Sequence, residues 1–166
     1  MNKNILLAGA SGLVGGHILD VLDDYNTDTR LVFGISAGGT AAINCSNQFD
    51  KTFTVYPALI AITSQMLKAQ NVTVVTGRSD NWTPADQARR FAENVECDLH
   101  VIDGYHGFLN PRQCRDIPDI MSLRNQNLDI PWDHSWTHLN FERGIRLEYN
   151  IRSRLYTEKL FTQWLT

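Results

Sequence analysis

The stretch that decides the fold reads Thr29-Arg30-Leu31-Val32-Phe33-Gly34-Ile35-Ser36-Ala37-Gly38-Gly39. The residues before Ser36 form a mostly apolar run typical of a buried strand, and the small residues after it are able to begin a helix. Ser36 is therefore expected in a strand-to-helix turn. Such a turn is cramped, so the residues two positions before and after the serine must be small, and Gly34 and Gly38 meet this requirement.

A serine in such a turn is a candidate nucleophile. The turn lifts the hydroxyl clear of the sheet and points the first N–H groups of the helix toward the same place. The backbone N–H of Ala37 is therefore a candidate oxyanion donor. The alternative is a glycine-rich turn that only connects a strand to a helix.

The rest of the chain alternates short apolar runs with helical patterns. Strands are predicted over 4–8, 53–56, 72–76 and 99–102, and helices over 13–22, 84–95 (with Thr83 as N-cap) and 155–165. This alternation predicts one α/β domain over residues 1–166, a three-layer sandwich with a mostly parallel sheet of about five strands. Residues 109–143 are poorly periodic and rich in Pro, Asn and Asp, which predicts an irregular excursion or a lid.

Two further polar residues, Asp80 and His106, each follow a predicted strand. Because ligands of open α/β sheets bind outside the carboxyl ends of the strands, both side chains are expected to lie near Ser36. His106 would act as general base and then general acid, and Asp80 would hold its imidazole in one tautomer. The alternatives are an aspartate that makes a turn or caps the next helix, and a polar surface histidine.

These segments resemble dienelactone-hydrolase-like α/β-hydrolases. The order of serine, acid and histidine is that of α/β-hydrolases. The elbow at 29–39, the acid loop with Asp-Asn-Trp-Thr-Pro-Ala and the His-Gly-Phe loop are each similar to their counterparts in the family. The resemblance extends over about 28–112 and 144–165.

The resemblance implies a serine hydrolase that cleaves a carboxylic ester or lactone through an acyl-enzyme. The triad would be Ser36, Asp80 and His106, with no cofactor. The members that cleave dienelactones use a cysteine nucleophile, so a serine favours general ester chemistry. The family has several strands before the nucleophile strand, and one of their loops supplies the second oxyanion donor. This chain has one predicted strand there, so Gly9 or Ala10 is the candidate donor.

Three aromatic residues accompany the predicted site. Trp82 lies in the acid loop, and Tyr105 and Phe108 flank the histidine. They are predicted to wall an apolar acyl pocket; packing in the core is the equal alternative.

The N-terminal segment supports another interpretation. Over residues 5–22, Gly9, Gly12 and Gly15 form G-x-x-G-x-x-G, which resembles the opening of short-chain dehydrogenases and implies NAD(P) binding. An acidic ribose-binding residue is expected at the end of the second strand, but Ser36 stands in that region. The ester hydrolase is therefore favoured, with a non-catalytic or truncated hydrolase-like binding protein as the main alternative.

The bulk composition restricts the partners. The net charge of −3 without a basic run argues against nucleic acid. No run approaches a membrane span or a signal-peptide core, and three cysteines without metal spacing predict free thiols in the cytoplasm. Asp133, His134 and His138 are a weak metal candidate that lacks a completing ligand. The few strands before the nucleophile strand leave a sheet edge, which predicts a homodimer.

Overall fold

The computed structural model describes residues 5–8, 29–59, 62–111, 114–117 and 145–166. Five strands form one parallel sheet in sequential order: β1 (Ile5–Ala8), β2 (Leu31–Ile35), β3 (Lys51–Val55), β4 (Val72–Gly77) and β5 (Cys97–Ile102). The described helices are α2 (Ala37–Asn44), α3 (Ala85–Asn94) and α6 (Ile151–Leu165), with 3-10 turns η1 (Ser46–Gln48) and η2 (Met66–Lys68).

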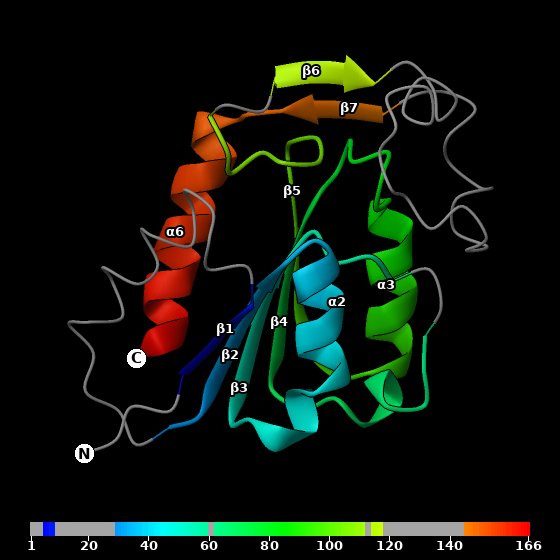
Figure 1. The fold of residues 1–166 in the computed structure, drawn as a ribbon, viewed down its shortest axis with the longest axis vertical. Coiled ribbons are helices and arrows are strands. Elements are labelled where there is room, and N and C mark those ends of the chain that lie inside the picture. The colour runs from blue at the N-terminus through cyan, green and yellow to red at the C-terminus, as the bar shows by residue number, and fades with distance from the viewer. Residues whose placement is uncertain (1–4, 9–28, 60–61, 112–113, 118–144) are drawn as a thin grey trace.

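The helices cover both faces of the sheet. Helix α2 connects β2 to β3, and α3 connects β4 to β5. Because the strands follow one another in one direction and such crossovers are right-handed, α2 and α3 lie on the same face. Helix α6 covers the other face (Figure 1). The predicted three-layer α/β sandwich is confirmed.

Two apolar clusters hold the layers together. Phe161 on α6 packs edge-on against Phe33 and Phe53 of the sheet, with ring centroids 5.3 and 5.2 Å away. On the opposite face, Val74 packs with Phe91 of α3 in a second cluster. Burial of each such side chain contributes roughly 1.5–3 kcal/mol, which explains why β2 and β4 consist mostly of apolar residues.

The sequence predicts neither of two short strands. Strand β7 (Ile145–Glu148) pairs antiparallel with β6 (Cys114–Ile117), which lies inside the stretch predicted to be irregular. The sequence of β6, Cys-Arg-Asp-Ile, has too few apolar residues to signal a strand. The predicted helix over 13–22 and most of the predicted lid lie outside the described residues. The single-domain organisation stays a prediction.

Helix α6 begins four residues earlier than predicted. The side-chain oxygen of Asn150 accepts hydrogen bonds from the backbone N–H groups of Arg152 and Ser153, at 3.1 and 3.2 Å. This is an N-cap, which satisfies two of the free donors of the first turn. Among the described residues, no helix is both long enough and apolar enough to span a membrane.

Candidate active site

Ser36 lies between β2 and α2 in the turn that the glycines predict. Its backbone has φ 53° and ψ −121°, a conformation that L residues rarely adopt. A Cβ on Gly34 would overlap the carbonyl group of Gly38, so the close approach within this turn requires glycine. Ala37 follows as the first residue of α2, so its N–H belongs to the free donors of the helix N-terminus.

The His106 imidazole faces this serine. The distance from Ser36 Oγ to His106 Nε2 is 3.1 Å. The histidine is buried in the loop after β5, where Gly104 and Gly107 have φ of 148° and 78°. A Cβ on Gly77, at the end of β4, would overlap the backbone of Gly104. Glycines therefore allow the histidine loop and the acid loop to approach closely.

Asp80 meets the other side of the imidazole. Its Oδ2 lies 2.8 Å from His106 Nδ1, and the carboxylate is fully buried. Its Oδ1 accepts hydrogen bonds from the backbone N–H groups of Trp82 and Thr83, at 2.9 and 2.8 Å. One oxygen therefore makes the turn that the sequence offered as an alternative, while the other contacts the histidine.

The hydrogen bonds assign the tautomer of His106. An ionised carboxylate only accepts hydrogen bonds, so the proton that joins Asp80 to His106 belongs on Nδ1. Nε2 then carries a lone pair directed at the Ser36 hydroxyl. A hydroxyl facing an unprotonated imidazole nitrogen is the arrangement that a general base requires.

Two aromatic rings pack against the imidazole. The ring centroids of Tyr56 and Trp82 lie 4.5 and 4.9 Å from that of His106. Tyr56 immediately follows β3 with φ 38°, and burial, with a smaller contribution from Asp80, raises the pKa of its phenol well above its usual value. The phenol is therefore neutral at neutral pH, and its ring packs on the imidazole.

The three predicted pocket residues separate into two groups. Trp82 and Tyr105 are half-buried, and the guanidinium of Arg146 lies 4.9 Å from the Tyr105 ring centroid. Phe108 is fully buried and packs edge-on against Tyr56, with ring centroids 5.2 Å apart. For Phe108 this geometry favours core packing over a pocket wall.

The remaining candidates fall outside the described residues. These are the oxyanion candidates Gly9 and Ala10, the rest of the glycine motif (Gly12 and Gly15), and the metal candidates Asp133, His134 and His138. Within the described part of the chain, no group of three or more His, Cys, Asp or Glu side chains is placed to hold a metal ion.

The sequence analysis missed one residue of this network, Thr83. The sequence predicts it as the N-cap of the helix that follows, but α3 begins at Ala85 and the Thr83 side chain makes no cap. Its hydroxyl lies 2.8 Å from Asp80 Oδ2 and 3.2 Å from His106 Nδ1 instead. A local signal exists only for the contact with Asp80, which Thr83 follows by three positions. The contact with His106 joins residues 23 positions apart.

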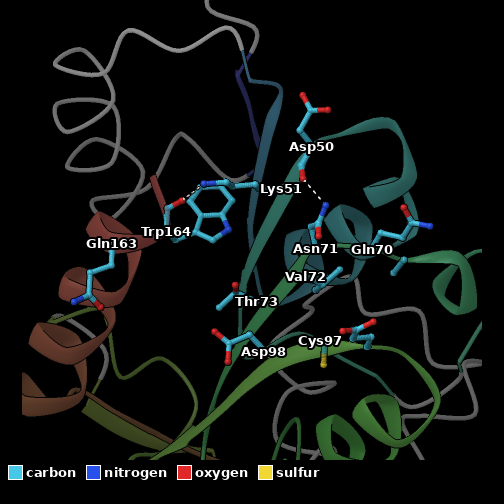
Figure 2. A pocket seen from close by; sticks show the side chains of 12 residues that line it. Asp50, Lys51, Gln70, Asn71, Val72, Thr73, Cys97, Asp98, Gln163 and Trp164 are labelled. Atoms are coloured by element: carbon cyan, nitrogen blue, oxygen red, sulfur yellow. Dashed lines mark hydrogen bonds between the residues drawn. The ribbon is translucent and has the colours of Figure 1, made fainter. Parts of the chain in front are cut away.

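A cleft of about 920 Å³ opens at the amino ends of the strands, at the opposite end of the sheet from Ser36 (Figure 2). Lys51 Nζ donates to the backbone carbonyl of Trp164 at 2.8 Å, and the Asn71 amide donates to that of Asp50 at 3.1 Å. Burial raises the pKa of the Cys97 thiol to about 11, so this thiol is protonated and a poor nucleophile at neutral pH. The better candidate active site is therefore the carboxyl edge around Ser36.

Comparisons with known proteins agree on the fold. The sequence matches no family model and no curated protein sequence. An α/β-hydrolase enzyme from a deep-sea metagenome library of the Medee basin superposes with a TM-score of 0.51 at 17% identity, over 95% of this chain and 66% of that one. A protein provisionally assigned as a dienelactone hydrolase, from Klebsiella pneumoniae, gives 0.50 at 15% identity, over 90% and 57%.

The chain therefore has an α/β-hydrolase fold, and the resemblance of its motifs to dienelactone-hydrolase-like proteins is supported at the level of the fold. It spans less than two thirds of the length of either solved neighbour. A shared fold does not by itself define a reaction, because unrelated chemistries use the same architecture. The reaction must be argued from the site.

Proposed function

We propose that the chain is a serine hydrolase that cleaves a carboxylic ester or lactone through an acyl-enzyme. The observation that carries this proposal is the hydrogen-bonded chain from Ser36 through His106 to Asp80, with separations of 3.1 and 2.8 Å. The three residues follow β2, β5 and β4, respectively. This is the order of nucleophile, base and orienting acid that acyl transfer requires.

In the acylation half of the reaction, His106 Nε2 takes the hydroxyl proton while Ser36 Oγ attacks the carbonyl carbon. The negative charge develops on the carbonyl oxygen, which the N–H of Ala37 and that of Gly9 or Ala10 stabilise. The bond to the leaving oxygen then breaks, and the imidazolium returns the proton to that oxygen. An alcohol leaves from an ester; a lactone ring opens and its hydroxyl stays on the acyl group.

Deacylation repeats these steps with water. His106 takes a proton from the water as its oxygen attacks the acyl carbon, and Ser36 recovers a proton when the second tetrahedral intermediate collapses. Asp80 stabilises the imidazolium in both halves. Atoms and charge balance with water alone, so the proposed reaction needs no cofactor.

The proposed substrate is a small ester or lactone whose acyl group contacts Trp82 and Tyr105. Both side chains are half-buried, and the Trp82 ring also packs on the base. The cytoplasmic location and the absence of nucleic-acid and membrane partners stay predictions from the sequence. Cell fractionation followed by immunoblotting tests the location.

The direct test compares hydrolysis of p-nitrophenyl acetate and butyrate by the chain and by Ser36→Ala, with circular dichroism to verify that both are folded. We expect turnover in the wild-type chain and a fall to the background rate in the variant, because the nucleophile is lost. Equal rates in two folded proteins would contradict the proposal.

One alternative is a hydrolase-like binding protein without a complete oxyanion hole, and the chain spans less than two thirds of the length of its solved neighbours. Loss of one oxyanion donor lowers turnover by roughly 10²- to 10³-fold while the triad itself stays intact. A fluorophosphonate probe separates the two, because attack of Ser36 on its phosphorus also develops negative charge on an oxygen that the oxyanion donors must stabilise. Labelling of the wild-type chain but not of Ser36→Ala supports the hydrolase, whereas no labelling favours the binding protein.

We also propose that the chain forms a homodimer. Strand β1 is the first strand of the described sheet and pairs with β2. A strand at the edge of a sheet presents backbone groups that a second copy is able to pair with. Sedimentation velocity at high protein concentration should therefore show a dimer; a single monomeric boundary would rule it out.

A further inference from the structure

Thr83 occupies the point where the acid loop, the histidine loop and the end of β3 meet. It is only 3% exposed. Its hydroxyl oxygen lies 2.8 Å from Asp80 Oδ2, 3.2 Å from His106 Nδ1 and 3.3 Å from the backbone carbonyl oxygen of Tyr56. The Thr83 side chain therefore contacts Asp80, His106 and the backbone of Tyr56, whose ring packs against the imidazole.

The hydroxyl has one proton to donate and lone pairs that accept. Asp80 Oδ2 and the Tyr56 carbonyl only accept, so the Thr83 proton points toward one of them, and the closer, charged carboxylate is the stronger acceptor. The oxygen lone pairs are then available to the N–H on His106 Nδ1. That N–H is shared between the carboxylate at 2.8 Å and the hydroxyl at 3.2 Å.

We infer that Thr83 is a positioning residue that holds His106 in the Nδ1–H tautomer with Nε2 directed at Ser36. In the opposite tautomer, the Nδ1 lone pair would face the acceptor-only carboxylate of Asp80, and the Thr83 hydroxyl could donate to Nδ1 only by giving up its hydrogen bond to Asp80 Oδ2. This inference rests on the proposed function. It assigns no chemical step to Thr83, because the hydroxyl acts through the base.

A purely local role does not account for the hydroxyl. The turn after Asp80 is already closed by the backbone N–H groups of Trp82 and Thr83, which both donate to Oδ1. The hydroxyl instead contacts Oδ2, the oxygen that faces the histidine. The rings of Tyr56 and Trp82 pack against the imidazole, and the Thr83 hydroxyl adds a directional contact at Nδ1.

The test uses three variants. Thr83→Val keeps the shape and removes the hydroxyl, whereas Thr83→Ser keeps the hydroxyl and removes the methyl group. Thr52→Val is the matched control, because Thr52 is fully buried on β3 and its hydroxyl has no hydrogen-bond partner. If Thr83→Val fails to fold, Thr83→Ala takes its place.

We expect Thr83→Val to lower kcat about 10- to 100-fold with KM within about twofold, as befits the loss of one hydrogen bond to a charged group in the transition state. Thr83→Ser should retain kcat within about threefold, and Thr52→Val should match the wild-type chain. An unchanged kcat in Thr83→Val, or an equal loss in Thr83→Ser, would overturn the inference.

A second readout does not depend on turnover. The ¹⁵N chemical shifts of the His106 imidazole report which nitrogen carries the proton. We expect Nδ1–H in the wild-type chain and Thr83→Ser, and a mixture with Nε2–H in Thr83→Val; identical tautomers in all three would refute the positioning role. An inactive wild-type chain in which the valine variant still changes the tautomer would reject the proposed hydrolase and retain the role of Thr83.

Discussion

Ser36 and its neighbouring glycines show how single residues set the geometry of the turn. The serine has φ 53° and ψ −121°, and Gly34 permits a backbone approach that any side chain would block. Such conformations cost of order 1–3 kcal/mol in a residue other than glycine. The strained conformation of Ser36 is held in place by a hydrogen bond, in which its backbone N–H donates to the Val55 carbonyl of β3 at 3.0 Å.

Replacement of Ser36 by glycine should relieve this strain. We expect Ser36→Gly to be more stable than Ser36→Ala by about 1 kcal/mol, because the relief exceeds the extra backbone entropy of glycine in the unfolded chain. Both variants lose the Ser36 hydroxyl, so only the backbone effect distinguishes them. Urea unfolding measures the difference; a glycine variant of equal or lower stability would show that the turn is not strained.

The elbow and the Thr83 contacts differ in how far the sequence predicts them. The glycine spacing around Ser36 is a local requirement, so it is visible in the sequence and the structure has the expected turn. The contacts of Thr83 join loops that lie 23 to 27 residues apart along the chain. A local pattern carries no information on such distances, so the sequence indicated only the nearest role, a helix cap.

At the level of elements, the segment from β7 to the start of α6 forms hydrogen bonds with the two loops that carry Asp80 and His106. The backbone N–H of Glu148 donates to the carbonyl of His106 at 3.2 Å, and that of Asn150 to the carbonyl of Phe108 at 3.1 Å. The N–H of Arg146 donates to the Asn81 side chain at 3.1 Å. These three hydrogen bonds connect the acid loop and the histidine loop to one segment, from β7 to the start of α6.

The cap of α6 provides a test at this scale. Asn150→Ala removes the acceptor of two backbone N–H groups and should lower the free energy of unfolding by about 1 kcal/mol. Asn150→Asp keeps an acceptor and adds a negative charge at the helix N-terminus, so its stability should be equal or higher. Urea unfolding of both variants measures the effect; an equal loss in both would contradict the assigned cap.

The sequence predicts the centre of the described sheet well because β2, β3 and β4 are largely buried on both faces and are rich in apolar and β-branched residues. It does not predict β6, whose four residues lack that pattern. The N-terminus of α6 was also missed, since the sequence pattern becomes strongly apolar only at Leu155, whereas Asn150 sets the start of the helix. The limit of prediction is therefore where hydrogen bonding, rather than burial, defines an element.

For the whole molecule, the parallel sheet explains why residues far apart in sequence meet. Strands β2, β4 and β5 all end at the same edge, and the loops after them bring Ser36, Asp80 and His106 within hydrogen-bonding distance. The cleft around Lys51 and Cys97 lies at the amino ends of the strands (Figure 2). The carboxyl ends of the strands therefore carry the hydrogen-bonded serine, histidine and aspartate, whereas the amino ends carry the cleft with Lys51 and Cys97.

The central claim is that Ser36 forms an acyl-enzyme, and mass spectrometry tests it most directly. The chain is mixed with p-nitrophenyl acetate, quenched in acid and digested, with Ser36→Ala treated in parallel. We predict one acetyl group on the peptide that contains Ser36 and none on the same peptide of the variant. Release of p-nitrophenol by the wild-type chain with the acetyl group on another residue, or equal release by the variant, would contradict the claim.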